Sequence, residues 1–303
     1  MVTVTLAALG QATPADLVAT VRAASDAELA GLAVDVAAES ALVSAVLGRL
    51  DTLAVPARLA ATAGRVRWQT PRGAGATVAL RDGGSTLTDE SPDVLVEGTP
   101  AQLLRLVAGQ LDLAAAYLGD QIRFRGDSAL VLALAGLFAA DGTAPVTGTP
   151  VDVRDVDPVA IAAALHGVPV EHLRTVLASD FRPLVLDEIL GRMPSFLNGR
   201  KAAGVQVTAG FRLTGRPDGE VDRFVLRLRD GRATVLVGEA ADAVAPEDCQ
   251  ATVTCEAADF LRLATGHLSP VSGVLRGQLR VTGDKIAALR LGAAFDVPTA
   301  VAG

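Results

Sequence analysis

The chain has 303 residues, with 27 basic and 34 acidic side chains and a formal net charge of −7 at pH 7. Half of its residues are apolar, aromatic residues supply only 3%, and the mean hydropathy is +0.39. The acidic balance disfavours nucleic acid and anionic membrane surfaces as partners, because both select clustered Lys and Arg. The longest charge-free apolar stretch, residues 128–140, is shorter than the roughly 18 residues of a membrane span, so integral membrane association is not expected.

The first residues, Met1-Val-Thr-Val-Thr, place no basic segment ahead of an apolar run. That pattern disfavours a secretory signal, and we therefore expect a cytoplasmic protein.

Cysteine and histidine are too scarce and too scattered for the common metal and catalytic sites. Cys249 and Cys255 cannot build a disulfide framework, and no Cys-x-x-Cys pair exists to bind zinc. His166, His172 and His267 never fall four residues apart. No phosphate-binding glycine loop, dinucleotide fingerprint or Gly-x-Ser-x-Gly motif occurs. We expect no cofactor, no metal and no catalytic residue of these kinds, and we interpret Cys255 as a small buried strand residue.

An internal repeat organises the chain. A shift of 157 positions aligns residues 94–138 with residues 251–295 without a gap, and 15 of the 45 positions are identical. Further upstream, Leu47-Gly-Arg matches Leu190-Gly-Arg, and Arg81-Asp-Gly matches Arg229-Asp-Gly. Thr13-Pro and Asp157-Pro each place an N-cap residue before a proline at the first helical position. The repeat predicts two tandem domains, residues 1–141 and 157–303, joined by a Gly/Pro/Thr-rich linker at 142–156.

Periodicity predicts the same order of elements in each copy: helices, then a hairpin-rich sheet, then helix, strand and helix. In the second copy the predicted helices cover residues 157–166, 170–177, 183–193, 257–265 and 285–295. Five strands are predicted from the alternation of residues 205–213, 224–228, 234–237, 252–255 and 278–282. Asp230-Gly is a two-residue hairpin signal, and Thr99-Pro-Ala-Gln of the first copy matches a capping box. The fold class is therefore α+β, a sheet with one Arg-studded wet face and one face covered by helices.

The second copy resembles the sterol carrier protein type 2 family in its bacterial form. The blocks that carry the resemblance, in order, are Leu186-Asp-Glu-Ile-Leu-Gly-Arg-Met-Pro-Ser-Phe, Lys201-Ala-Ala-Gly, Phe211-Arg-Leu-Thr-Gly-Arg-Pro-Asp-Gly, Arg229-Asp-Gly-Arg, Asp259-Phe-Leu-Arg-Leu-Ala-Thr-Gly and Gly277-Gln-Leu-Arg-Val-Thr-Gly-Asp. The first copy is similar but diverged. It has Asp51-Thr where the second has Pro194-Ser, and it lacks the Thr-Gly-Arg-Pro-Asp-Gly loop.

The resemblance implies that each domain is a five-stranded, mostly antiparallel sheet covered by helices, with an apolar tunnel between the layers. It also implies a sterol, fatty acid or acyl chain as partner, bound without a cofactor. Carried onto this chain, the candidate lining residues are Leu186, Ile189, Met193, Phe196, Phe211, Phe224, Phe260, Leu263, Leu268, Leu275, Leu289 and Phe295. Each of these has an alternative interpretation as ordinary core.

Several non-apolar residues that recur in both copies have structural explanations. Gln278 and Arg280 are candidates for orienting a ligand, but on an alternating strand we expect them to face solvent. Gly126-Asp and Gly283-Asp recur at matched positions, and we interpret them as a turn followed by the N-cap of the last helix.

Three functions remain open at this point. The leading hypothesis is a non-catalytic lipid or steroid carrier. The second is an enzyme that shelters a cyclisation or isomerisation, with Asp187 or Glu188 as a lone acid whose pKa burial raises. The third is a structural role, in which the first copy is only the packing partner in a pseudo-dimer. A homo-oligomer is left open.

Overall fold

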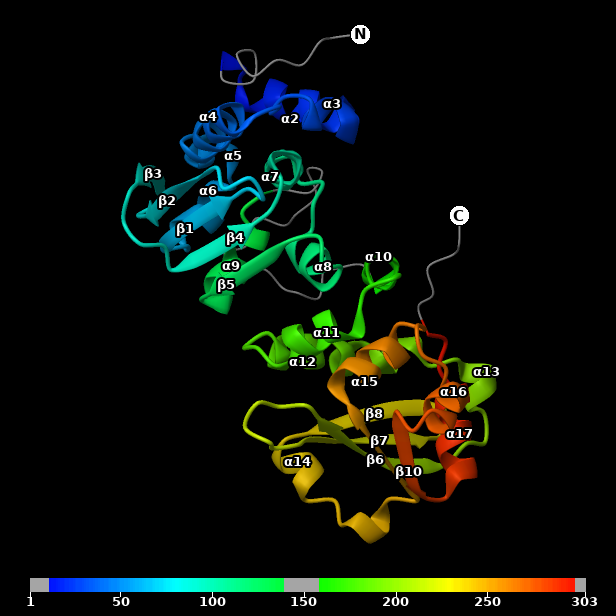
Figure 1. Cartoon of the computed structure of the whole chain (residues 1–303). Helices are drawn as coiled ribbons and strands as arrows, with labels where there is room; N and C mark the ends of the chain where they lie inside the picture. The colour runs from blue at the N-terminus through cyan, green and yellow to red at the C-terminus, as the bar shows by residue number, and fades with distance from the viewer. Residues whose placement is uncertain (1–10, 139–157, 298–303) are drawn as a thin grey trace. The chain divides into compact units, whose positions relative to one another are not determined.

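The computed structural model describes residues 11–138 and 158–297. The predicted linker at 142–156 and the predicted cap at Asp157 lie outside the described residues. The chain divides into two compact units, Met1–Asp155 and Val156–Gly303, which are described separately here (Figure 1). None of the described helices is long and apolar enough to cross a membrane.

The first unit begins with helices and continues into a sheet. Its helices are α2 (Pro14–Ala23), α3 (Asp26–Ala30), α4 (Val36–Leu47), α5 (Leu50–Leu53), α6 (Pro56–Ala60), α7 (Pro100–Val107), α8 (Leu113–Leu118) and α9 (Ser128–Ala135). Its strands are β1 (Gly64–Gln69), β2 (Gly75–Arg81), β3 (Gly84–Thr88), β4 (Val94–Glu97) and β5 (Arg123–Gly126).

The second unit repeats this order with additional short helices. Its helices are α10 (Pro158–Ala164), α11 (Val170–Leu177), α12 (Arg182–Arg192), η2 (Met193–Phe196), α13 (Gly199–Ala202), α14 (Glu239–Asp242), η3 (Pro246–Asp248), α15 (Ala257–Ala264), α16 (Pro270–Leu275) and α17 (Lys285–Ala293). Its strands are β6 (Val207–Thr214), β7 (Asp222–Arg229), β8 (Arg232–Val237), β9 (Ala251–Glu256) and β10 (Leu279–Gly283).

Both units contain a five-stranded mixed sheet with one topology. The strand orders are β3-β2-β1-β4-β5 and β10-β9-β6-β7-β8, which are the same order read from opposite edges. Neighbouring strands run antiparallel except in the central pairs β1/β4 and β6/β9, which are parallel. The predicted α+β class and mostly antiparallel sheets are confirmed, and the shared topology agrees with the internal repeat.

Local sequence signals explain the hairpins and the last helix of each unit. Asp230 and Gly231 have φ of 51° and 70°, the left-handed pair that a two-residue type I′ turn requires. Asp284 Oδ1 accepts hydrogen bonds from the backbone N–H groups of Ile286 and Ala287, at 2.8 and 3.0 Å. Asp127 caps α9 in the same way. The predicted caps are therefore confirmed, each of a kind worth about 1 kcal/mol.

The two faces of the second sheet are both covered in part. Phe224 and Leu226 of β7 are almost fully buried on the face that α15 and α17 pack against. Val225 points to the opposite face and is buried with Ala241 and Val244, at and just after α14. The expectation of one wholly wet face is thus wrong, because the segment between β8 and β9 folds back over β7 and β8 (Figure 1).

Candidate ligand-binding site of the second unit

An aromatic cluster lies in the interior of the second unit. Phe211 of β6 and Phe224 of β7 are direct partners in the antiparallel register. Their rings stack with centroids 4.5 Å apart and an angle of 6° between the planes. Phe260 of α15 tilts onto both rings, at 5.3 Å from Phe224 and 6.1 Å from Phe211. Three predicted lining residues, far apart in the sequence, therefore meet between sheet and helix.

The other predicted residues differ in where the fold places them. Leu186 on α12 and Leu268 after α15 are buried. The half-buried candidates are Ile189, Met193, Phe196, Leu263 and Phe295. Ligand contact by these residues stays a prediction.

Leu275 and Leu289 lie at the surface instead of in the interior. Leu275 is 82% exposed and Leu289 is 49% exposed. On α17 the inward positions are taken by Ala287 and Leu291, four residues apart, and Leu289 falls between them on the outer side. Leu275 ends α16, in which Gly273 is the buried residue. The repeat aligns both leucines with leucines of the first copy, but sequence periodicity did not show whether each side chain points to the interior or to solvent.

A short bridge joins the η2 segment to the chain after α17. Leu197 forms an isolated antiparallel bridge with Phe295. Asp296 accepts hydrogen bonds from Asn198 Nδ2 and Lys201 Nζ, both at 2.7 Å, and these contacts lower the pKa of its carboxyl group, Lys201 contributing most. The bridge brings the candidates Phe196 and Phe295 to the same end of the unit.

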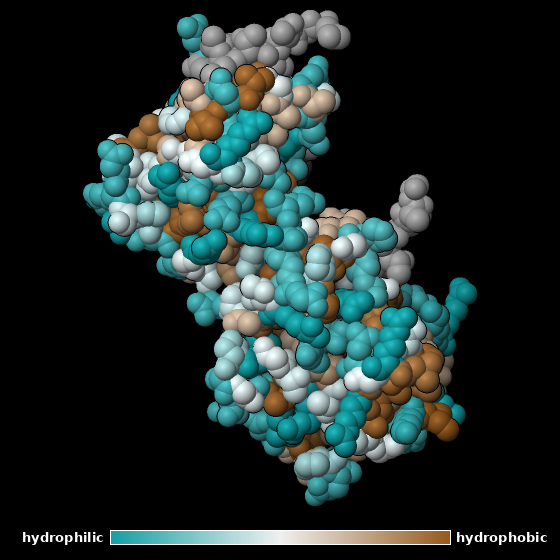
Figure 2. Space-filling view, in the orientation of Figure 1, coloured by the Kyte–Doolittle hydropathy of each residue, from teal (hydrophilic) through white to brown (hydrophobic). Residues whose placement is uncertain are grey.

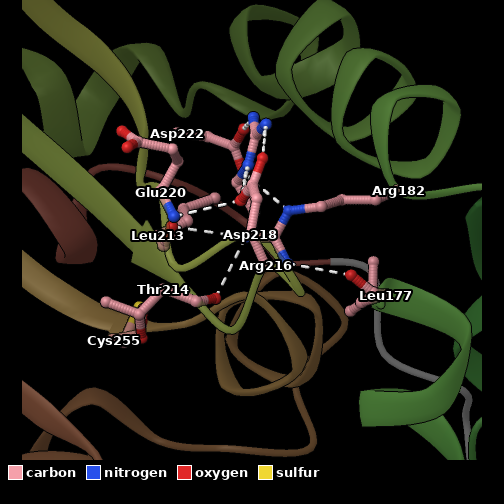
Figure 3. Close-up of polar contacts among 9 residues, drawn as sticks. All are labelled: Leu177, Arg182, Leu213, Thr214, Arg216, Asp218, Glu220, Asp222 and Cys255. Carbon is pink, nitrogen blue, oxygen red and sulfur yellow. Dashed lines mark hydrogen bonds and ion pairs between the residues drawn. The ribbon is translucent and has the colours of Figure 1, made fainter. Parts of the chain in front are cut away.

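Arg182, the first residue of α12, is a charged side chain buried at the opposite end of the helix from η2 (Figure 3). Its Nε donates to Asp222 Oδ2 of β7 at 2.6 Å. Its two terminal nitrogens donate to the carbonyl oxygens of Leu177, Leu213 and Thr214 at 2.9 to 3.2 Å. The guanidinium therefore ties α11 and α12 to the ends of β6 and β7, and every contact compensates part of its desolvation.

The loop between β6 and β7 completes this cluster (Figure 3). Arg216 Nη1 donates to Asp222 Oδ1 at 3.0 Å, so one carboxylate joins two guanidinium groups. Arg216 also pairs with Asp218, and chiefly this contact lowers the pKa of Asp218 to about 2. Sequence reasoning missed Arg182 and Asp222 altogether. The available signal was the Thr-Gly-Arg-Pro-Asp-Gly loop, which was noted as part of the family resemblance and for its absence from the first copy, but not for an ion pair.

The two acids and the thiol singled out by the sequence have different surroundings. Asp187 is exposed, and Glu188 pairs with Arg192 one helical turn away, so neither is a lone acid in an apolar interior. Burial raises the pKa of the Cys255 thiol to about 12, which keeps it protonated and confirms its interpretation as a buried strand residue. Within residues 11–138 and 158–297, no group of three His, Cys, Asp or Glu side chains is suited to hold a metal ion.

The two polar candidates of the repeat also have defined places. The expectation that Gln278 faces solvent is wrong: it is half-buried, and its side-chain amide donates to Oδ1 of the buried Asp259 at 2.8 Å. Arg280 on β10 is exposed, as expected for the outward side of an alternating strand. The site is accordingly an apolar interior, with polar groups at its ends that are mostly engaged with one another.

Comparison with known protein families agrees with this arrangement. The model of the SCP-2 sterol transfer family matches residues 44–139 and 186–296, one region in each unit and together more than half of the chain. No curated protein sequence matches the chain significantly.

Solved structures show weaker likeness. The chain is similar to sterol carrier protein-2 like-3 from Aedes aegypti, with 24% identity over 37% of this chain and 92% of that chain and a TM-score of 0.29. Sterol carrier protein 2 from Yarrowia lipolytica, in its apo form, is 18% identical over 40% and 99%, with a TM-score of 0.29. The inverting sec-alkylsulfatase Pisa1 from Pseudomonas sp. is 20% identical over 64% of this chain, with a TM-score of 0.32. The chain covers only 25% of that sulfatase.

Proposed function

The chain belongs to the SCP-2 sterol transfer family, and on that premise we propose that its second unit carries a sterol, a fatty acid or an acyl chain without catalysis. The ligand would occupy an apolar tunnel between the sheet and its helices. The observation that supports this most directly is the convergence of Phe211, Phe224 and Phe260 in an interior lined by aliphatic side chains. Burying each CH₂ of a ligand there is worth about 0.8 kcal/mol, so such a site needs no directed chemistry.

The half-buried residues of α12 and α15 are the proposed contacts that a test can alter safely. Ile189 and Leu263 are partly accessible, in contrast to the fully packed aromatic cluster. Changing Ile189 to Gln places an amide against the ligand chain and leaves it without a hydrogen-bond partner there. We expect the affinity for a fatty acid to fall about tenfold, equivalent to 1.4 kcal/mol.

Leu184 provides the matched control. It is also a half-buried residue of α12, five positions before Ile189 and about 140° away around the helix. Displacement of a fluorescent fatty acid should be weakened by Ile189→Gln and unchanged by Leu184→Gln. Equal effects of both variants, or no displacement and no lipid in an organic extract of the purified protein, would contradict the proposal.

Trp68 offers a way to identify the unit that binds. It is the single tryptophan of the chain, it lies on β1 of the first unit, and its Nε1 donates to the carbonyl oxygen of Gly98 at 3.0 Å. A ligand held in the second unit should leave Trp68 emission unchanged while native mass spectrometry detects the bound mass. A saturable change in that emission would instead place the ligand in the first unit.

A further inference from the structure

Bulky apolar side chains of α16 and α17 face outward and form what we term the α16–α17 face. Its members are Val271, Val274, Leu275, Ile286 and Leu289, with exposed fractions between 41% and 82%. The two helices approach each other at Gly292 of α17, where a Cβ would lie 4.0 Å from Pro270 Cγ of α16. Figure 2 shows hydrophobic residues gathering over these helices. Exposed apolar side chains gathered in this way mark an interaction surface.

The residues around the α16–α17 face are strongly basic. Residues 270–295 contain four basic side chains and one acidic side chain, in a chain whose net charge is −7. Arg276, Lys285 and Arg290 lie on or directly after the two helices and are exposed, whereas Arg280 is exposed on the sheet face away from Phe211. The acidic residue, Asp284, already accepts two backbone hydrogen bonds as the cap of α17. The local charge is therefore opposite in sign to that of the whole chain.

At the matched positions of the repeat, the first unit lacks three of these cations and the bulky Ile286, although Leu118 and Leu132 match Leu275 and Leu289. Gly119 aligns with Arg276, Ser128 with Lys285 and Ala133 with Arg290. The bulky Ile286 is likewise replaced, by Ala129. Since both units share one topology, the fold does not demand the cations at 276, 285 and 290 or the bulky side chain at 286.

The positive charge around the α16–α17 face distinguishes between two candidate partners, a second copy of the chain and an anionic lipid bilayer. A second copy of the chain, packed by two-fold symmetry, would set the same cations against one another, which costs free energy. An anionic lipid bilayer complements both features, because its headgroup phosphates attract Lys and Arg and its acyl boundary accepts apolar side chains.

We propose that the α16–α17 face docks the second unit on anionic lipid bilayers. This rests on the proposed function in that the membrane would be the source or the destination of the carried ligand. Leu275 and Ile286 enter the headgroup region, and Arg276, Lys285 and Arg290 contact the phosphates. The two leucines that sequence analysis assigned to the tunnel thereby have a role at the surface.

Sedimentation of the full chain with lipid vesicles tests the docking. Binding is expected with vesicles of phosphatidylcholine containing phosphatidylglycerol, weaker as salt increases, and absent with phosphatidylcholine alone. Arg276→Glu combined with Lys285→Glu should lower the partition coefficient at least about tenfold, since each basic residue near an anionic surface contributes to its attraction.

A second pair of arginines supplies the matched control. Arg229 and Arg232 are exposed opposite each other on the β7–β8 hairpin, so changing both to Glu alters the net charge equally. That variant should bind vesicles almost as the wild type does. Leu275→Ser combined with Ile286→Ser should abolish the binding that remains at high salt, with circular dichroism confirming the fold.

Three results overturn the docking proposal: no binding to anionic vesicles, equal losses in the two charge variants, or conversion of a dimer to a monomer by the α16–α17 variants without vesicle binding. Displacement of a fluorescent fatty acid is measured in parallel without vesicles. If displacement persists while docking fails, only the docking proposal is wrong, and if displacement fails too, so does the proposed function.

Discussion

Arg182 and Glu39 occupy the same place in the two copies of the repeat and carry opposite charges. Each lies eight residues before the leucine of the matching Leu-Gly-Arg sequences, and each residue is only 5% exposed. Glu39 on α4 accepts a hydrogen bond from the Thr70 hydroxyl at 2.6 Å, just past the end of β1. Arg182 on α12 reaches the carbonyl oxygen of Leu213 near the end of β6. In each unit a buried polar side chain therefore links the helix, α4 or α12, to the end of the first strand of the sheet, β1 or β6. Either an acidic or a basic residue can make this link.

We predict that Arg182→Met destabilises the second unit by about 3 kcal/mol, because buried acceptors that lose their donor carry an uncompensated desolvation cost. Its Asp222 partner and three carbonyl oxygens lose a donor. Urea unfolding followed by circular dichroism should show the loss, while Trp68 fluorescence, which reports on the first unit, should keep its midpoint.

Arg216→Met is the control for that measurement. Arg216 shares Asp222 but is more exposed, and such pairs contribute at most about 1 kcal/mol. If both arginine variants lose the same stability, burial is not what makes Arg182 important.

The β6–β7 loop should hold its ion pair down to strongly acidic pH. The pKa of Asp218 is lowered to about 2, with the hydrogen bonds from Arg216 as the largest cause. A lowered pKa stabilises the folded state above the ordinary value of 3.8 and the contribution is lost as pH falls towards 2. Carboxyl-carbon NMR should show Asp218 titrating near pH 2, and the Arg216→Met variant should return its midpoint towards the ordinary value. An ordinary midpoint in the wild type would show that the pair does not persist in solution.

Gly98→Ala should destabilise the first unit by about 1–3 kcal/mol, the usual cost of overpacking. A Cβ at residue 98 would lie 2.7 Å from Trp68 Cζ2, inside van der Waals contact. Gly84→Ala, where the nearest atom is 3.5 Å away, should cost little. Trp68 fluorescence during urea unfolding measures both, and it should also report a shifted native emission only for the residue-98 variant.

The two free thiols should react at very different rates. Cys255 is buried on β9, which raises its pKa to about 12, whereas Cys249 is half-buried with a less perturbed pKa. An aromatic disulfide reagent at neutral pH should modify Cys249 in the folded protein and Cys255 only on unfolding. Cys249→Ala should remove the fast phase. A fast phase that survives this change would mean that β9 opens readily.

Much of the fold was predictable because its signals are local. Asp230 and Gly231 specify a hairpin through their own backbone angles, and Asp284 caps α17 through atoms two and three residues away. Alternation along β7 likewise predicted that Phe224 and Leu226 share the covered face, as they do. The candidate site was predicted less completely, since Leu275 and Leu289 face outward and the cover over Val225 was not foreseen.

By itself, the sequence determined the duplication, the α+β class and the apolar character of both interiors, since these depend on composition and on spacings of a few residues. Only the tertiary structure decided which apolar residues meet and which stay exposed. Arg182 contacts Asp222, which lies 40 residues later in the chain, and Phe260 of α15 contacts Phe224 of β7. Chain folding, and not sequence spacing, brings the two residues of each pair together. The same contacts leave the α16–α17 face uncovered, because Ala287 and Leu291 already fill the inward side of α17.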